Sequence, residues 1–374
     1  MILAAAFGLL VAMPVSAQEK PTLTEDHYDQ WERLGPAALS PNGAWMAVSI
    51  RRVSEEEELR IHSTTSDSVV IVPFGSRAVF SSDNRWVAYS IGRSEEERDA
   101  ARSRDQEIYD KLGLLNLETG EQTVRTDFAS FHFSDDGRYL ALRRYKPKDK
   151  ESDGVDVVVH DLLSDRDMSF GNVSEMAWQA EGSLLAMTTD ADDQVGNGVT
   201  VYDPLSGRIS SMDSDEATYR QLSWRDDSSD LVVYKTEIDD AFEDTAHVAL
   251  VWRDIADGRG VSYRLSSETN DAFPASMRIV EFRAPSWSND GQTLFVGIQE
   301  RRPSPSECEG GASEEPGTDQ ECLEKDEEAA GVEIWHTLDR DPVPQQRVRE
   351  RQLRRENYLS AWNVESGGFV QLGD

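Results

Sequence analysis

The sequence predicts an all-β chain because a turn unit recurs along it, a second kind of hairpin follows most copies, and aromatic residues are plentiful. The unit is an aromatic or apolar residue, a Ser-rich turn with Asp or Asn and Gly, and a strand of alternating apolar residues. Its clearest copies are LSPNGAWMAVSI, FSSDNRWVAYSI, FSDDGRYLALRR and WSNDGQTLFVGI, which begin at Leu39, Phe80, Phe133 and Trp287. Two weaker copies begin at Trp178 and Trp224.

The spacing of these copies predicts the size of the repeating structure. The residue after the leading aromatic or apolar residue falls at 40, 81, 134, 179, 225 and 288. Such intervals fit a four-stranded unit, with insertions in the longer ones. Asp or Asn accepts hydrogen bonds from nearby backbone NH groups, and Gly adopts the positive φ of a tight turn. We therefore expect hairpin tips at Ser40–Gly43, Ser134–Gly137 and Ser288–Gly291.

A second hairpin completes each unit. It is clearest in YDPLSGR from Tyr202, LGLLNLETGEQTV from Leu112 and YLSAWNVESGGFVQL from Tyr358, with looser forms from Leu59, Val157 and Val248. Two hairpins give four antiparallel strands, which is one β-propeller blade. The predicted fold is a β-propeller of about six four-stranded blades, either a closed ring or an incomplete ring of seven or eight.

Two insertions interrupt the predicted propeller, which we place at residues 39–374 after a lead-in segment at 18–38. Arg93–Lys111 is highly charged and has a single β-branched residue, Ile108, so it predicts a short helix or an arm. The other insertion covers about 300–357, and its second half, RVRERQLRRENY, also predicts a helix. Insertions of this kind would decorate one face of the propeller or contact a neighbouring domain.

Residues 1–17 resemble a secretory signal. An apolar stretch from Ile2 to Val11 is too short to span a bilayer, and small residues precede Gln18. The alternative is a buried N-terminal strand or helix. A signal predicts an exported chain, periplasmic or extracellular, and no other segment is apolar enough to predict a membrane span.

The net charge of −33 makes nucleic acid an unfavourable partner, because a polyanion repels phosphate backbones. The acidic surface is either a solvated, soluble surface or an adaptation to salt. The two cysteines, Cys308 and Cys322, lie in a stretch rich in Ser, Glu, Gly and Pro, which predicts an exposed loop. We expect them to form a disulfide in an oxidising compartment, the alternative being two free thiols; no His pair accompanies them to suggest zinc.

The paired hairpin motifs resemble the N-terminal propellers of prolyl oligopeptidase-like serine peptidases and, more loosely, the periplasmic Tol-Pal propeller. Leu23–Arg52 is similar to the entry to the first blade of large exported members of the peptidase family, and Val332–Gln346 is similar to a later segment. The resemblance covers nearly the whole chain after the signal. It implies a C-terminal α/β-hydrolase domain as the catalytic partner and a peptide substrate, with no cofactor.

Catalytic residues of that family are not found in this sequence. Its nucleophile lies in a G-x-S-x-G elbow, and the nearest approaches here are Gly75-Ser76-Arg77 and Ser366-Gly367-Gly368. The six histidines, at 27, 62, 132, 160, 247 and 336, lack metal-ligand spacing, and His132 and His160 are expected within strands. The acidic runs Glu55–Glu58 and Glu95–Glu97 are interpreted as solvated charge rather than a site for a substrate amino terminus.

Three functions follow from these patterns. The chain is a non-catalytic propeller that gates or binds peptides in an intact peptidase, or a stand-alone periplasmic propeller that binds a protein. The third, an enzyme that works from the propeller channel, is disfavoured because no convergent set of acid, base or metal ligands is visible. No catalytic, cofactor or metal residue is assigned.

Overall fold

The computed structural model describes residues 24, 31–53, 57–257, 260–304 and 343–373. The predicted signal segment, Cys308, Cys322 and residues 332–342 lie outside this part of the chain. Within it the chain folds into six successive antiparallel β-units, five of four strands and a last one of five, which are the blades of a β-propeller. Every blade is made from consecutive strands, as the hairpin pairs predict.

The first three blades follow the chain in order. Blade 1 contains β1 (Glu32–Leu39), β2 (Trp45–Arg52), β3 (Glu58–Ser63) and β4 (Val69–Pro73). Blade 2 contains β5 (Gly75–Phe80), β6 (Trp86–Ile91), β7 (Lys111–Asn116) and β8 (Gln122–Arg125). Blade 3 contains β9 (Phe128–Phe133), β10 (Tyr139–Arg144), β11 (Val155–Asp161) and the first half of β12 (Arg166–Trp178).

The long strand β12 joins blade 3 to blade 4, because its second half pairs with the next strand in sequence. Blade 4 continues with β13 (Leu185–Thr189), β14 (Gly198–Asp203) and β15 (Arg208–Ser214). Blade 5 contains β16 (Tyr219–Trp224), β17 (Leu231–Glu237), β18 (Ala246–Arg253) and β19 (Val261–Leu265), with a short 3₁₀ turn at Ile255–Asp257. Blade 6 contains β20 (Met277–Ile279), β21 (Ser286–Trp287), β22 (Thr293–Glu300), β23 (Tyr358–Asn363) and β24 (Phe369–Gln371).

The first strand begins at Glu32, within the segment expected as a lead-in. Most of β1 is exposed, so its sequence lacks the alternation of apolar residues that marks a half-buried strand. Backbone pairing with β2, from Glu32 opposite Arg52 to Leu39 opposite Met46, defines the strand instead.

Packing between blades forms the core. Five clusters of buried apolar side chains fill the five interfaces between successive blades. At the first of them Ala47, Leu59 and Ile61 of blade 1 pack with Val87 and Tyr89 of blade 2. Each blade is therefore stabilised by its neighbours, as a propeller requires.

The turn unit shows why its residues recur. In the third copy Ser134 Oγ donates to Asp136 Oδ1 over 2.5 Å and accepts from the buried Tyr139 NH over 2.9 Å. The same pair of bonds occurs in the copies that begin with Ser40, Ser81 and Ser288. A positive φ at the tip is found at Gly43, Gly137 and Gly291, as predicted, and at Asn84 in the second copy.

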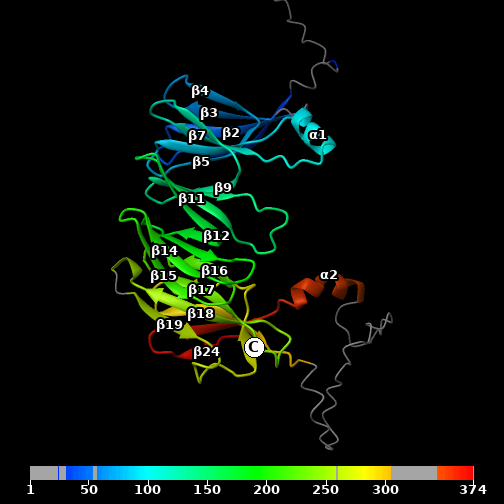
Figure 1. Cartoon of the computed structure of the whole chain (residues 1–374), viewed down its shortest axis with the longest axis vertical. Coiled ribbons are helices and arrows are strands. Elements are labelled where there is room, and N and C mark those ends of the chain that lie inside the picture. Colours follow the sequence, from blue (N-terminus) through cyan, green and yellow to red (C-terminus); the bar gives the residue numbers. More distant parts are fainter. Residues whose placement is uncertain (1–23, 25–30, 54–56, 258–259, 305–342, 374) are drawn as a thin grey trace, which may run out of the picture.

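The six blades form an open arc. Figure 1 shows β4 at the top and β24 at the bottom, at opposite ends of the longest axis, with the other blades stacked between them. A closed ring of six would place Leu39–Ile50 beside the last hairpin, and the structure does not. The described blades therefore do not form the closed ring of six that was one form of the prediction.

Both helices decorate the same side of the arc, on the right in Figure 1. Helix α1 (Glu95–Ser103) lies between the second and third strands of blade 2, and α2 (Val343–Leu353) lies between the same two strands of blade 6. We call this side, which carries every loop between a second and third strand, the insertion face. Helix α1 falls within the predicted segment Arg93–Lys111, whereas α2 overlaps the predicted segment RVRERQLRRENY but begins four residues before it and ends at Leu353. Among the described residues no helix is long and apolar enough to cross a membrane.

Candidate functional site

The charged segment between β6 and β7 folds into an ordered arm on the insertion face. Ser94 caps α1 by accepting a bond from Glu97 NH over 3.1 Å, and the Glu97 carboxylate accepts the Ser94 NH over 3.1 Å. This capping box fixes the start of the helix. Arg93 Nε donates to the Tyr109 carbonyl over 2.8 Å and so joins the two ends of the arm. The arm thereby becomes one wall of a cleft.

A cleft of about 760 Å³ lies where this arm meets blades 1 and 2. It is lined by Trp31, Glu32, Arg33, Arg51, Arg52, Val53, Glu57, Phe74, Ser76, Gly92, Arg93, Arg98, Ile108 and Asp110. Five arginines face three acidic residues in this lining, so the cleft carries a positive balance within a chain of net charge −33. We call it the arginine cleft.

Two arginines of the cleft lie directly opposite each other on neighbouring strands. Arg33 of β1 pairs in register with Arg51 of β2. Like charges at such positions are destabilising. Arg51 has an ion pair with Glu57, with Nε and Oε1 3.2 Å apart and both side chains about half exposed. In the described part of the chain, the Arg33 guanidinium has no hydrogen bond or ion pair.

Other arginines at the rim are fixed by carboxylates. Glu32 Oε1 accepts from Arg52 over 2.8 Å and from Arg60 over 2.6 Å, and Glu58 bonds to the same two guanidinium groups. Hydrogen bonds from Arg60 and Arg52 lower the pKa of Glu32. This network lies on the side of blade 1 that faces away from blade 2 and holds the strand ends that form the cleft.

The arginine cleft continues along the arm. A second cleft of about 370 Å³ shares Arg98 and Ile108 with it, and a third of about 400 Å³ shares Lys148 with the second. In the third, the rings of Tyr109 and Tyr145 stack with centroids 4.1 Å apart. The three clefts are neighbours that share lining residues from blade 1 to blade 3, and we call them together the insertion groove.

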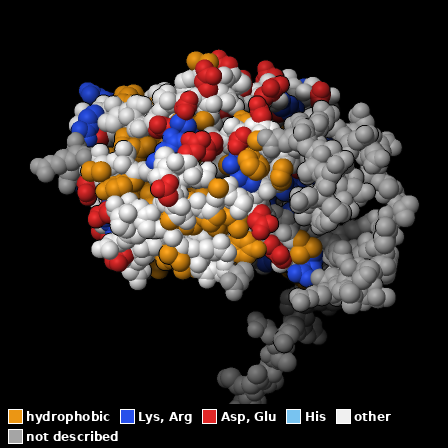
Figure 2. Space-filling view, turned by 90° about the horizontal axis from the view of Figure 1, so that it is seen from below, with side chains coloured by type: hydrophobic (Ala, Val, Ile, Leu, Met, Phe, Trp, Pro, Cys, Tyr) orange, Lys and Arg blue, Asp and Glu red, His pale blue; other side chains and the backbone are white. Residues whose placement is uncertain are grey.

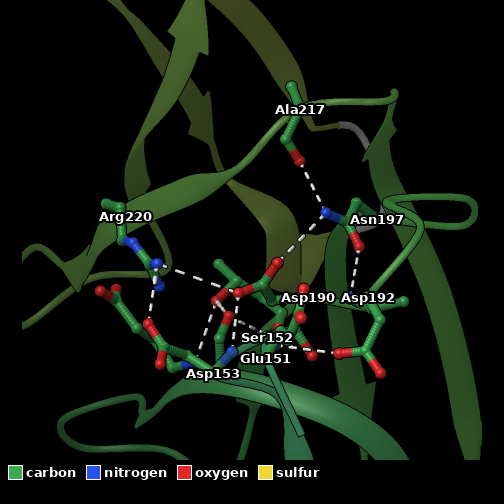
Figure 3. A network of polar contacts seen from close by, with 12 residues as sticks. Glu151, Ser152, Asp153, Asp190, Asp192, Asn197, Ala217 and Arg220 are labelled. Carbon is green, nitrogen blue, oxygen red and sulfur yellow. Dashed lines mark hydrogen bonds and ion pairs between the residues drawn. The ribbon is translucent and has the colours of Figure 1, made fainter. Parts of the chain in front are cut away.

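A separate polar network lies farther along the insertion face, between blades 3, 4 and 5 (Figure 3). Arg220 of β16 donates to Asp153 Oδ2 over 2.9 Å, and its Nη2 lies 3.9 Å from Asp190 Oδ2. Asp153 NH donates to the same Asp190 oxygen over 3.0 Å. Asn197, fully buried, donates to the Ala217 carbonyl over 2.9 Å and accepts from Ala191 NH over 2.8 Å.

In this network, which we call the latch, Asp153, Asp190 and Asn197 have protein partners, whereas the buried Ser152 Oγ has no hydrogen-bond partner among the described residues. A hydrogen bond from Lys146 and the charge of Arg220 lower the pKa of Asp153. Asp190 is buried and accepts the Asp153 NH, while the Asp153 carboxylate is 57% exposed and accepts the Arg220 guanidinium; both bonds join segments of different blades. The described residues contain no group of three or more His, Cys, Asp or Glu placed to hold a metal ion. The latch therefore joins three blades.

Histidines within the described residues have structural surroundings. His160 of β11 lies 2.7 Å from Asp167 Oδ1 through Nδ1, and His247 of β18 lies 3.2 Å from the Ile279 carbonyl through Nδ1. His132 is in β9, and burial lowers the pKa of His132 and of His247. The strand positions predicted for His132 and His160 are confirmed. His62 lies in β3, whereas His27 and His336 lie outside the described residues.

The sequences nearest to a nucleophile elbow occupy other structures. Gly75-Ser76-Arg77 lies in β5, and Ser366-Gly367-Gly368 forms the turn between β23 and β24. Of the acidic runs, Glu57 and Glu58 bind arginines, Glu97 caps α1, and Glu55 and Glu56 lie outside the described residues.

Sequence reasoning did not find the arginine cleft. Its lining comes from five separate stretches between residues 31 and 110, which meet only when blade 2 packs on blade 1. The one feature of the sequence that pointed to the cleft was the adjacent pair Arg51-Arg52 at the end of an apolar strand. The turn serines were part of the motif, but their double hydrogen bond was also missed.

No family model matches the sequence, and no curated protein matches it. Among solved structures, an acylaminoacyl peptidase from Pyrococcus horikoshii is similar at 10% identity and a TM-score of 0.36, over 72% of this chain and 43% of that one. The β-propeller domain of the Trilobed protease from Pyrococcus furiosus is similar at 11% identity and a TM-score of 0.38, over 73% of this chain and 79% of that one. TolB from Acinetobacter baumannii is similar at 14% identity and a TM-score of 0.32, over 72% of this chain and 62% of that one.

At such low identities the likeness concerns the fold alone. This chain spans less than half the length of the Pyrococcus horikoshii enzyme.

Proposed function

We propose that this chain is the non-catalytic propeller portion of a prolyl oligopeptidase-like peptidase, and that its insertion face binds or gates peptides in the intact enzyme. One observation carries the proposal: both helical insertions, the arginine cleft and the insertion groove gather on one face of the arc. Loops and clefts on a rigid scaffold are where proteins place binding residues. The hairpin motifs resemble those of the peptidase propellers, and this resemblance implies an α/β-hydrolase domain as the catalytic partner.

A stand-alone binding propeller is the second candidate, and the latch favours it. Asp153, Asp190 and Arg220 join three blades through bonds within this chain. The middle of the arc is therefore held together without contact with another domain. In this case the partner would be a protein or peptide bound at the same insertion face.

Cross-linking tests the position of the binding face. A short unstructured peptide with a photoreactive phenylalanine analogue would be irradiated with the chain, and the attachment sites mapped by mass spectrometry. We expect attachment within residues 93–111 and on the facing ends of blades 1 and 2. Attachment confined to the turn hairpins, such as 134–138 and 203–207, would contradict the proposal.

The gene itself separates the two candidates. A reading frame for an α/β-hydrolase directly after codon 374 would support the peptidase. A stop codon followed by an unrelated gene would support the stand-alone module and refute the peptidase assignment.

A further inference from the structure

We propose that the arginine cleft is a subsite for carboxylate groups and that it selects an acidic segment of the peptide ligand. The inference rests on the proposed function for the presence of a peptide, and it adds the chemical class that the face prefers. It comes from the guanidinium groups of Arg33, Arg51 and Arg98, which line one cleft.

The first step is the unbalanced charge on blade 1. Arg33 and Arg51 are directly opposite on β1 and β2, and a single exposed carboxylate, that of Glu57, is paired with Arg51. Arginines at directly opposite positions of two neighbouring strands repel each other unless an anion lies near both. A ligand carboxylate placed between them would relieve this repulsion and accept bonds from both.

The second step is the opposite wall. Arg98 extends from α1 into the lining of the same cleft, and its guanidinium has no hydrogen bond or ion pair with any described residue. The capping box and the Arg93 bond to Tyr109 fix the helix that carries it. Arg98 is thus presented by a rigid element, which lowers the entropy lost when a ligand binds.

The third step is selectivity. The whole chain carries a charge of −33, so an acidic peptide is repelled by most of the surface. A cleft in which five arginines face three acidic residues provides a local exception. Arginine is suited to this role because its planar donors match a carboxylate in pairs. Beside these donors, Trp31, Phe74 and Ile108 provide apolar surface for the adjoining ligand residues.

The experiment compares three synthetic peptides of equal length that carry a neutral fluorophore. One has Glu side chains and an amidated C-terminus, one is uncharged with a free C-terminal carboxylate, and one is uncharged and amidated. Fluorescence polarisation with the full chain at low salt gives the three dissociation constants. We expect the uncharged amidated peptide to bind most weakly, and the other two to show whether side-chain or terminal carboxylates enter the cleft.

Arg33→Gln with Arg98→Gln tests the residues, and Arg166→Gln with Arg208→Gln is the matched control. The control arginines are exposed on hairpins away from the insertion face, and the change in net charge is the same. Loss of two exposed ion pairs predicts roughly tenfold weaker binding of the carboxylate peptide by the cleft variant. The control variant should change the dissociation constant of the same peptide by less than about twofold. Circular dichroism and a thermal melt would verify that both variants fold.

Two results would overturn the inference. One is equal affinity of the chain for all three peptides, and the other is an equal loss of binding in the cleft and control variants. If the uncharged amidated peptide binds as tightly as the others, the insertion face still binds peptides and only the acidic preference fails. If no peptide binds, the proposed function fails as well.

Discussion

Arg138 Nη2 donates to Asp161 Oδ2 over 2.9 Å and so joins the two hairpins of blade 3. Burial alone would raise the pKa of Asp161, but the bond from Arg138 and the NH groups of Leu163 and Ser164 outweigh it and lower the pKa to about 2. The side chain is 16% exposed, so solvent screens this contact only in part. The pair links the turn unit to the second hairpin of the same blade.

This pair predicts a pH dependence. Because the folded-state pKa lies below the unfolded value of about 3.9, Asp161 stabilises the fold at higher pH, and its contribution is lost as pH falls from about 4 to about 2. Asp161→Asn should lower the free energy of unfolding at neutral pH by about 1–2 kcal/mol and flatten the acid limb of the stability profile. Urea unfolding at several pH values measures both. Asp67→Asn, at an exposed turn, is the control. Identical profiles for wild type and Asp161→Asn would refute this role.

The turn serines predict a second effect on stability. Ser134→Ala leaves the buried Tyr139 NH without the acceptor it has now, at 2.9 Å, and Asp136 without its donor. A buried NH without an acceptor lowers the free energy of unfolding by about 1–3 kcal/mol, so the urea concentration at the midpoint of unfolding should fall clearly. Ser211→Ala is the matched control, because Ser211 is exposed on the outer strand β15. Equal midpoints for the two variants would mean that the Ser134 bonds contribute nothing.

The repeat was predictable because its chemistry is local. Ser134, Asp136 and Gly137 form one turn within a few residues, so the motif, the hairpin and the blade follow from adjacent letters. The start of β1 at Glu32 was not predictable in this way, since an exposed strand carries no apolar alternation. The openness of the arc depends on the angle between packed blades, which no local pattern encodes.

The arginine cleft was unpredictable for a related reason. Arg33, Arg51 and Arg98 are far apart in sequence, and only the register of β1 with β2 and the packing of the arm bring them together. The latch between Asp153, Asp190 and Arg220 depends in the same way on three loops that meet. Sequence patterns predict single strands and helices well, but they do not show which side chains from separate blades meet in the folded chain.

The disulfide stays a prediction, because Cys308 and Cys322 lie outside the described residues. Both fall in the insertion between β22 and β23, so a bridge should close a loop of about 15 residues and stabilise it by about 3 kcal/mol. Cys308→Ser should leave the blades folded, with an unchanged far-ultraviolet circular dichroism spectrum. Mass spectrometry of exported material without reductant measures the bridge. Two free thiols there would refute it.

The chain alone should hydrolyse no amide or ester. Hydrolysis of this kind requires an activated nucleophile beside a base and oxyanion donors. The two nearest elbow sequences lie in a strand and in a hairpin turn. A peptide nitroanilide assay with the purified chain should give the rate of the buffer. Activity that co-purifies with the chain through several steps and is lost in Ser76→Ala would contradict this prediction.

The open ends of the arc predict association between copies. On the outer side of blade 1, Leu34 is 74% and Ile71 56% exposed, and on blade 6 Val370 is 60% exposed. Figure 2 views the arc from the blade 6 end and shows hydrophobic side chains spread across it. In a closed ring such faces pack on neighbouring blades, and charge opposes association without covering apolar surface. The end of one copy should therefore pack on the start of the next, which is a contact that does not close on itself.

Light scattering over a range of concentrations at moderate salt tests this association. We expect the average mass to rise with concentration, and Ile71→Lys with Val370→Lys to reduce the rise by placing charge on both end faces. Leu163→Lys with Leu205→Lys is the matched control, since these residues are 72% and 65% exposed at hairpin tips. The control should associate like wild type. A monomer at every concentration, with a cooperative melt, would mean that the end faces of the arc are stable in water without a partner.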